Sequence, residues 1–253
     1  MNINKLIFFL YFILLPTQGF SSKCIAHRGN NIDNTENTWD SFLSAYSLGA
    51  DGIEIDIQHT SDGKAIIFHD KRLRRLVINK PNRKCPRLKK IKKLTLLEIS
   101  ENCQYDDGQE ILTLEKFLKR SFYWDIHLFI EFKDTPSKNT LELIDRNFKN
   151  FNKIKFISFK KSALSKTYKY LGHRTKKDIN FLKLYYFWVP SKPKWTPNIP
   201  IRSYWLFYKR ILKLNKFYSM GMWVIDDKED IKRAKKNNVE YITTNNPKLC
   251  IEV

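Results

Sequence analysis

Eight short apolar runs, rich in β-branched and aromatic residues, recur along the 253-residue chain. They are typical of β-strands, because such side chains pack well on a pleated, buried surface. Eight is also the number of strands whose closed barrel is just filled by its own side chains. The runs lie at residues 24–27, 52–57, 65–69, 127–132, 154–159, 181–187, 222–225 and 241–244.

Helical patterns fall between several of these runs. Asn37 is placed to cap a helix that ends at Gly49. This alternation predicts an α/β fold, a (β/α)8 TIM-type barrel, with the segment 190–200 as a loop. An open, doubly wound sheet is the alternative, but no G-x-G-x-x-G follows the first strand. Further helices are predicted at 113–120, 139–149, 162–172, 208–218 and 228–238.

The connection between strands 2 and 3 is predicted to be helix-free. Only twelve residues separate Asp56 from His69, and T-S-D-G at 60–63 is a turn signal. A hairpin centred on Ser61-Asp62 would pair Glu54 opposite His69, and a helix-free crossover fits the sequence equally well. Either arrangement brings His69 close to the carboxylates of the preceding strand.

Residues 1–22 resemble a secretory signal peptide. Lys5 precedes an apolar run, Leu6 to Leu15, that is about half the ~20 residues needed to span a membrane. We therefore expect cleavage, export to the periplasm or the medium, and a single barrel domain over residues 23–253. An uncleaved N-terminal anchor is the alternative.

Export would place the four cysteines in an oxidising compartment. Cys24 and Cys250 can then tie together the two ends of the barrel, and Cys85 and Cys103 can pair across one connection. Four unpaired thiols remain the alternative. No Cys/His spacing indicates a zinc site.

The formal net charge of +20 is concentrated in one segment. Between Lys71 and Leu97 there are twelve Lys or Arg and no acidic residue. The segment has no aromatic residue to stack on a base, which argues against nucleic acid as a partner. A solvated loop and helix surface is the preferred interpretation, and such a surface can attract anionic lipid or phosphate and so contact an anionic membrane peripherally.

Carboxylates interrupt the apolar strand G-I-E-I-D-I. Glu54 and Asp56 share one face because side chains alternate along a strand. Two buried carboxylates repel each other unless a cation lies between them. Oxygen ligands favour Mg²⁺ or Ca²⁺, although a surface strand or an ion-pair network also explains many such pairs.

A third carboxylate follows the same logic on another strand. Glu131 and Lys133 lie two apart in H-L-F-I-E-F-K, so both point to one place. Glu131 would join the cation, and Lys133 would meet an anionic substrate oxygen. A cross-strand salt bridge is the alternative for this pair.

Two histidines stand at strand ends. His27 and His69 flank the proposed cation site, and imidazoles titrate near neutrality, which suits a base and an acid. Arg28, beside His27, can hold a phosphate through two hydrogen bonds. A lone histidine at a strand end is more often structural, so the pair carries the argument.

The ordered set of motifs resembles the glycerophosphodiester phosphodiesterase family. The likeness covers nearly all of the chain after the N-terminal segment and is densest over residues 25–70. It rests on H-R-G followed by E-N-T, G-A-D-G-I-E-I-D-I-Q-H-T-S-D-G, I-I-F-H-D, I-L-T-L-E-K-F-L, I-E-F-K, I-S-F and the run from Gly221 to Pro247.

The resemblance implies a barrel enzyme with one bound Mg²⁺ or Ca²⁺ and assigns its residues by role. These are Glu54, Asp56 and Glu131 for the cation, His27 and His69 for acid–base catalysis, and Arg28, Lys133 and Trp223 for the substrate. Thr35, R-L-R-R-L-V (72–77) and V-I-D-D (224–227) depart from the family pattern. They leave this set intact but put the choice of substrate in doubt.

The expected reaction is the metal-dependent hydrolysis of glycerophosphodiesters, small-molecule substrates, to glycerol 3-phosphate and an alcohol. One alternative is a phospholipase D-like enzyme that acts on lysophospholipid or phospholipid at a membrane. Another is a non-catalytic secreted barrel that binds phosphodiesters. The presence of every expected polar residue argues against the last.

Overall fold

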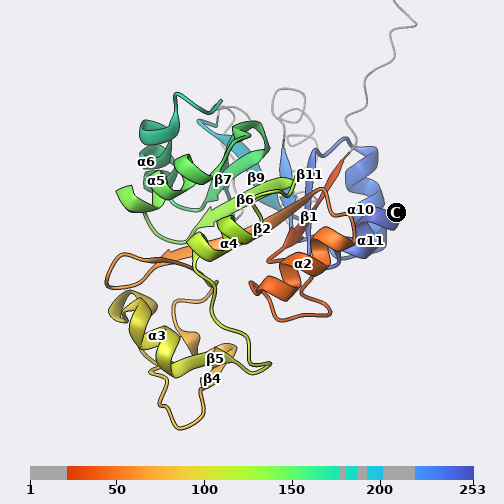
Figure 1. Ribbon diagram of the computed structural model, residues 1–253. Coiled ribbons are helices and arrows are strands. Elements are labelled where there is room, and N and C mark those ends of the chain that lie inside the picture. Colours follow the sequence, from red (N-terminus) through yellow and green to blue (C-terminus); the bar gives the residue numbers. More distant parts are fainter. Residues whose placement is uncertain (1–21, 177–179, 187–192, 202–219) are drawn as a thin grey trace, which may run out of the picture.

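Eight parallel strands close into a barrel (Figure 1). The computed structural model describes residues 22–176, 180–186, 193–201 and 220–253. Strand β1 pairs with β2 on one side and with β11 on the other, which closes the sheet. The barrel strands are β1 (Lys23–His27), β2 (Gly52–His59), β6 (His127–Phe132), β7 (Ile154–Ser158), β8 (Phe181–Leu184), β9 (Thr196–Pro200), β10 (Gly221–Trp223) and β11 (Tyr241–Thr244).

Helices surround the barrel, as the alternating pattern predicts (Figure 1). The predicted helix at 208–218 lies outside the described residues, and α11 was not predicted. None of the helices in the described ranges has the length and apolar character needed to span a bilayer. The helices around the barrel are α2 (Trp39–Ser47), α4 (Leu114–Arg120), α5 (Lys138–Asn147), α6 (Lys161–Leu171), α10 (Lys228–Lys236) and α11 (Pro247–Glu252).

The two faces of β2 meet different surroundings. Ile53, Ile55 and Ile57 are fully buried in the core that also holds Phe42 of α2, between the sheet and its helices. The barrel interior holds a separate apolar cluster that includes Ile25, Phe129, Ile157, Leu182 and Tyr241. Because side chains alternate along a strand, the polar residues between the three isoleucines face this interior.

One strand assignment from the sequence is wrong. The run at 65–69 does not form a barrel strand: β3 (Ala65–Ile67) pairs antiparallel with β2 alone. The eighth barrel strand is β9, in the segment predicted as a loop. Its sequence, T-P-N-I-P, carries two prolines, which disfavour a central strand. The pairing of this segment with β8 on one side and β10 on the other outweighs this local preference, because it completes the barrel.

The helix-free connection after β2 is confirmed as a hairpin. Its register pairs Ile57 with Ile67, one residue away from the register that would set Glu54 opposite His69. The side-chain amide of Gln58 donates to the carbonyl oxygens of Phe68 and Asp70, at 2.6 and 2.8 Å. Gln58 thereby fixes the segment that carries His69.

A small unit, residues 71–105, follows the hairpin and is called the insert below. It protrudes from one side of the barrel (Figure 1) and has its own apolar core, which includes Leu73, Ile91 and Tyr105. A disulfide joins Cys85 to Cys103 inside it. Its elements are η1 (Leu73–Arg75), β4 (Val77–Asn79), η2 (Ile91–Lys93), α3 (Leu96–Asn102) and β5 (Cys103–Tyr105).

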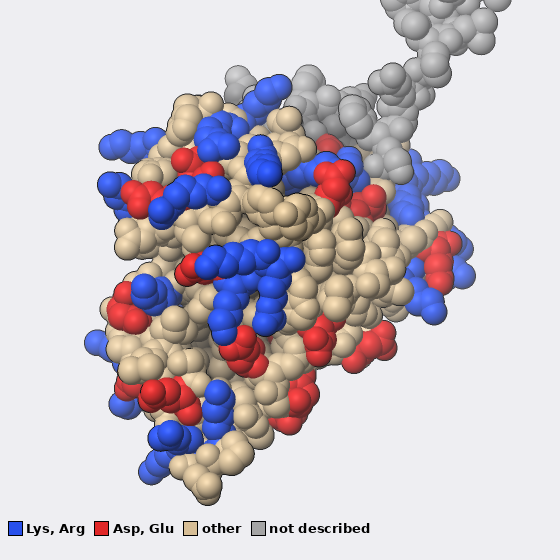
Figure 2. Space-filling view, viewed as in Figure 1, with Lys and Arg blue, Asp and Glu red and all other residues tan. Residues whose placement is uncertain are grey.

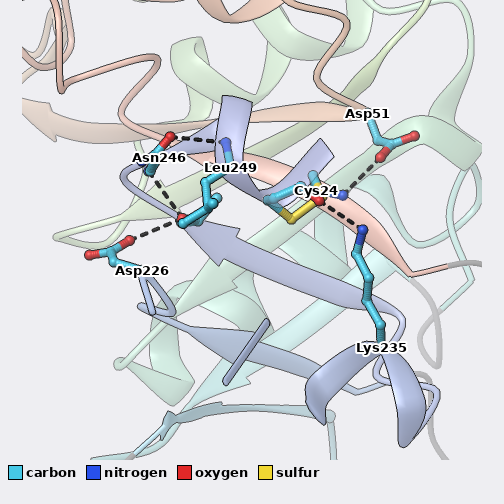
Figure 3. Close-up of a disulfide and its surroundings, with 8 residues drawn as sticks. Cys24, Asp51, Asp226, Lys235, Asn246 and Leu249 are labelled. Atoms are coloured by element: carbon cyan, nitrogen blue, oxygen red, sulfur yellow. Dashed lines mark hydrogen bonds between the residues drawn. A yellow bond between two sulfur atoms is a disulfide. The ribbon is translucent and has the colours of Figure 1, made fainter. Parts of the chain in front are cut away.

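A second disulfide, Cys24–Cys250, links β1 to α11 (Figure 3). The backbone N–H of Cys24 donates to Asp51 at 2.8 Å, and the ammonium of Lys235 donates to the carbonyl of Cys250 at 2.7 Å. The asparagine before α11, Asn246, caps the helix by accepting from the N–H of Leu249. Both predicted pairings are confirmed.

Replacing Cys24 and Cys250 together with serine should lower the free energy of unfolding by about 2–5 kcal/mol, because the disulfide restricts the unfolded chain. Urea unfolding followed by tryptophan fluorescence measures the loss. The Cys85→Ser/Cys103→Ser variant is the matched control, with a sequence separation of 18 against 226. The expectation would be wrong if the Cys24/Cys250 variant lost no more free energy of unfolding than the Cys85/Cys103 variant.

Candidate active site

Three carboxylates converge inside the barrel. Glu54 and Asp56 lie on the inward face of β2, and Glu131 of β6 stands beside Asp56 in the parallel register. One oxygen from each lies within 4.8 Å of the others. All three side chains are buried. The face-sharing predicted from the sequence is confirmed, and the barrel adds the contact between strands.

Two cations and one amide surround Asp56. The ammonium of Lys133 lies 2.8 Å from Asp56 Oδ1 and 2.6 Å from Glu131 Oε1. The Nε of Arg28 lies 3.1 Å from Asp56 Oδ2, which also accepts from the amide of Asn37 at 2.8 Å. Asn37 therefore serves the site, and Thr38 caps α2 in its place, which corrects the cap predicted from the sequence.

The three carboxyl groups differ in acidity. Burial raises the pKa of Glu54 well above its usual range, and the neighbouring charges of Asp56 and Glu131 raise it further. Burial also raises the pKa of Glu131 to about 7, against the opposing effect of Lys133. Burial opposes ionisation of Asp56 too, but Lys133 and Arg28 outweigh it and hold the pKa of Asp56 below its usual range.

This donor set fits a hard divalent cation. Glu54 Oε2 accepts from the backbone N–H of Arg28 at 3.1 Å, whereas Glu54 Oε1 is buried without a hydrogen-bond partner. A buried carboxylate oxygen without a partner carries a large desolvation cost. Three carboxylate oxygens around one point are the ligands that Mg²⁺ and Ca²⁺ prefer. A cation bound there would remove both the repulsion and the unpaired oxygen.

His27, at the end of β1, is held in one tautomer. Its Nδ1 lies 2.7 Å from Asn245 Oδ1. The amide of Asn245 donates to the carboxylate of Asp226 at 2.8 Å, so Oδ1 is the oxygen that faces His27. Asn31 also donates to that oxygen, at 2.8 Å. Nδ1 must therefore carry the proton, and Nε2 keeps a free lone pair.

His69 begins a chain of charged contacts that ends at Arg28. Asp70 Oδ1 lies 2.7 Å from Nδ1 of His69, and Arg75 Nε donates to Asp70 Oδ2 at 2.6 Å. The two terminal nitrogens of Arg75 donate to Glu36 at 3.0 and 2.6 Å. Glu36 also accepts from Arg28 at 3.0 Å. Arg75 thus connects the segment that carries His69 with the loop that carries Arg28 and Glu36.

Both imidazoles lie in the field of the same charged groups. Burial lowers the pKa of His27 to about 4, with a further lowering from Arg28. Burial also lowers the pKa of His69, while the charge of Asp56 raises it and Lys133 and Arg28 lower it. The fold therefore brings the two predicted histidines to one charged cluster.

Trp223 of β10 belongs to the aromatic part of the barrel interior. It is half-buried, its indole N–H donates to the carbonyl of Asn198 at 3.3 Å, and its ring meets Phe159 edge to face at 5.5 Å. Phe159 in turn stacks on Tyr186, which is 73% exposed. The structure therefore brings Trp223 to an aromatic wall with one solvent-facing end.

Besides Asn31 and Asp70, five polar residues of this network were not identified from the sequence. Their side chains carry amides and charges that are common on any surface, and only the folded barrel shows what they contact. One signal was available: Glu36 and Asn37 belong to the E-N-T motif, and Asp226 and Asn245 to the C-terminal run. They are Glu36, Asn37, Arg75, Asp226 and Asn245.

Comparisons with known proteins show which family this chain resembles. Residues 27–179 match the model of the glycerophosphoryl diester phosphodiesterase family. A glycerophosphodiester phosphodiesterase of Caldanaerobacter subterraneus subsp. tengcongensis is 30% identical over 244 residues, which cover 90% of this chain and 96% of that protein.

Solved structures show the same fold. A glycerophosphodiester phosphodiesterase of Parabacteroides distasonis superposes with a TM-score of 0.76 at 21% identity, covering 92% of this chain and 96% of the other. A phosphodiesterase of Oleispira antarctica, in complex with the product sn-glycerol-3-phosphate, superposes with a TM-score of 0.75 at 20% identity, covering 92% and 98%.

Mg²⁺ or Ca²⁺ should stabilise the folded chain by about 2.7 kcal/mol at a hundredfold excess over Kd. The melting temperature of the chain should therefore rise. Glu54→Gln should abolish this shift. In the ion-free protein the same change should alter stability little, because the raised pKa of Glu54 keeps that carboxyl largely protonated and Gln is a neutral side chain of the same shape.

Differential scanning calorimetry with and without chelator measures both effects, and Glu229→Gln, an exposed acid on α10, is the control. If added cation raised the melting temperature of the Glu54→Gln variant as much as that of the parent, Glu54 would not be a ligand of the proposed cation site.

Proposed function

Because this chain belongs to the glycerophosphoryl diester phosphodiesterase family, we propose that it hydrolyses glycerophosphodiesters to glycerol 3-phosphate and an alcohol. One observation carries the proposal: a buried carboxylate triad lies close to two histidines whose Nδ1 atoms are both engaged. The product named for the Oleispira antarctica phosphodiesterase, sn-glycerol-3-phosphate, supports the same chemistry.

We propose Mg²⁺ or Ca²⁺ as the cofactor, with Glu54, Asp56 and Glu131 as ligands. Such an ion supplies a Lewis acid that offsets the negative charge growing on a phosphoryl oxygen. Formally, the three carboxylates and the two cations Arg28 and Lys133 sum to −1, and a divalent ion changes this to +1. The loaded site therefore attracts an anionic diester more strongly than the ion-free site does.

Arg28 and Lys133 hold the phosphate. Their charged nitrogens already converge on Asp56, and each has further donors to offer. Glu36 and Asp56 fix the guanidinium of Arg28, so little side-chain entropy is lost when a substrate binds. Both cations stabilise the charge that develops in the transition state. Trp223 packs against the substrate at the aromatic wall.

His27 is the base of the first step. Its Nδ1–H is bound to Asn245, so Nε2 accepts the proton of the substrate's own glycerol hydroxyl. The oxygen of that hydroxyl forms a bond to phosphorus, and the bond from phosphorus to the departing alcohol breaks. The product is a cyclic phosphodiester.

His69 is the acid of the first step. The carboxylate of Asp70 faces Nδ1 and stabilises the imidazolium, whose Nε2–H is donated to the departing alcohol. In the second step, His69 removes a proton from water, which opens the cyclic phosphate, and His27 returns its proton to the glycerol oxygen. Both histidines end in their starting states.

Export and peripheral contact with an anionic membrane remain part of the proposal. Residues 1–22 carry the pattern of a signal peptide, and residues 1–21 lie outside the described residues. The two disulfides support an oxidising compartment, periplasmic or extracellular.

The chain, given Mg²⁺ or Ca²⁺, should release glycerol 3-phosphate from glycerophosphocholine in a coupled assay. Chelator should abolish the release and added cation restore it. His27→Ala should lower kcat by about 10²–10⁴-fold, whereas His173→Ala, an exposed histidine, should not. Faster turnover of lysophospholipid than of glycerophosphocholine would show that the preferred substrate is a lipid. If no diester released glycerol 3-phosphate, the proposal that the chain is an enzyme would be refuted.

Two substrates whose leaving groups differ in their need for a proton distinguish the roles of the two histidines. A glycerol phosphodiester of 4-nitrophenol needs no proton on its departing oxygen, so His69→Ala should recover most of its loss on that substrate. His27→Ala should not recover, because the attacking hydroxyl still needs a base. Steady-state kcat/KM for both diesters gives the ratio, and recovery by His27→Ala instead would reverse the assignment.

A further inference from the structure

The insert carries half of the formal charge of the chain. Residues 71–105 contain twelve Lys or Arg and two Glu, which gives +10 of the total +20. Both glutamates belong to α3, so the only charged residues from Lys71 to Lys93 are Lys and Arg. Figure 2 shows Lys and Arg side chains protruding over the lower part of the view, where β4, β5 and α3 lie in Figure 1.

The fold brings two basic stretches side by side. Arg72 forms an antiparallel β-bridge with Lys90, and the N–H of Ile91 donates to the carbonyl of Lys71 at 2.9 Å. The Nε of Arg72 donates to the carbonyl of Leu88 at 3.0 Å. The buried apolar core and the Cys85–Cys103 disulfide hold these neighbours together despite their like charge.

These charges lack acidic partners. Among the residues that the structure describes, Arg75 is the one basic residue of the insert that forms an ion pair. Eleven of the twelve basic residues are exposed, the exception being half-buried Lys80. Grouped, exposed and unpaired cations raise the local potential, which favours a polyanionic partner.

An apolar side chain stands within this basic surface. Leu88 is 70% exposed and lies between Arg87 and Lys89. A basic surface with an exposed aliphatic side chain matches an anionic bilayer, which offers headgroup charge and an acyl boundary. Nucleic acid fits less well, because no aromatic residue lies between 71 and 97 to stack on a base.

We propose that the insert docks the protein on anionic phospholipid bilayers through the surface of Lys71, Arg72, Arg87, Leu88, Lys89 and Lys90. The insert begins directly after the His69–Asp70 pair, and its Arg75 contacts Asp70 and Glu36 at the site. Docking therefore places the active site close to the membrane, where diesters derived from phospholipids arise. This last consequence rests on the proposed function, whereas docking does not.

The experiment compares full-length chains by co-sedimentation with vesicles of phosphatidylcholine, with or without 30 mol% phosphatidylserine, a composition chosen for the assay. We expect binding to the anionic vesicles alone, and its loss as salt rises, because the Debye length falls from about 10 Å at 0.1 M to about 3 Å at 1 M. Arg87→Glu/Lys89→Glu/Lys90→Glu should lower partitioning at least about hundredfold, at roughly fivefold for each charge.

The control reverses three exposed lysines elsewhere, Lys166→Glu/Lys169→Glu/Lys236→Glu, with the same change in net charge. It should retain most of the binding, and Leu88→Ser should lose part of it. Equal losses in the two triple variants, or equal binding to neutral vesicles, would overturn the proposal. So would tight binding of single-stranded oligonucleotide without vesicle binding.

Turnover of glycerophosphocholine is measured on the same samples. The insert variant should keep this activity, since none of its three substitutions touches the site. A variant that loses vesicle binding but keeps turnover supports docking as a separate property. Vesicle binding by a chain that shows no turnover would leave docking intact and refute only the proposed function.

Discussion

The repulsion among three carboxylates buried within 4.8 Å of one another is the constraint on which this molecule depends. A low-dielectric interior magnifies such repulsion, so the surrounding fold must supply positive charge. Arg28 and Lys133 supply part of it, and Asn37 adds a neutral donor. Glu54 Oε1 remains without a hydrogen-bond partner, which a further cation would supply.

The barrel makes this arrangement rigid. Parallel register sets Glu131 beside Asp56, and closure brings His27 beside Glu54 on the neighbouring strand. Each of these side chains therefore has a position fixed by backbone hydrogen bonds on both sides, and the Cys24–Cys250 disulfide secures β1 from outside. A site built on such strands loses little order when it binds an ion or a phosphate.

The loops add the asymmetry that acid–base chemistry requires. Asn245 leaves His27 with a free lone pair at Nε2, whereas burial lowers the pKa of His69 and the hydrogen bond to Asp70 opposes that lowering. Arg75 joins Asp70 to Glu36 and so connects the insert to the loop after β1. A surface element that carries much of the positive charge is thereby bound to the loops of the proposed active site.

Local patterns within the sequence determined the strand–helix alternation, the inward face shared by Glu54 and Asp56, the pairing of the cysteines as one of two options, and the ordered motifs of the family. All but the pairing of Cys24 with Cys250, which are 226 residues apart, are features of residues close in the chain or of motifs in a fixed order. The tertiary structure decided that T-P-N-I-P forms a strand, that residues 65–67 leave the barrel, and that Asn37 serves the site. It also decided the tautomer of His27 through Asn245, 218 residues away. These outcomes depend on barrel closure and on contacts between distant segments, which no local propensity encodes.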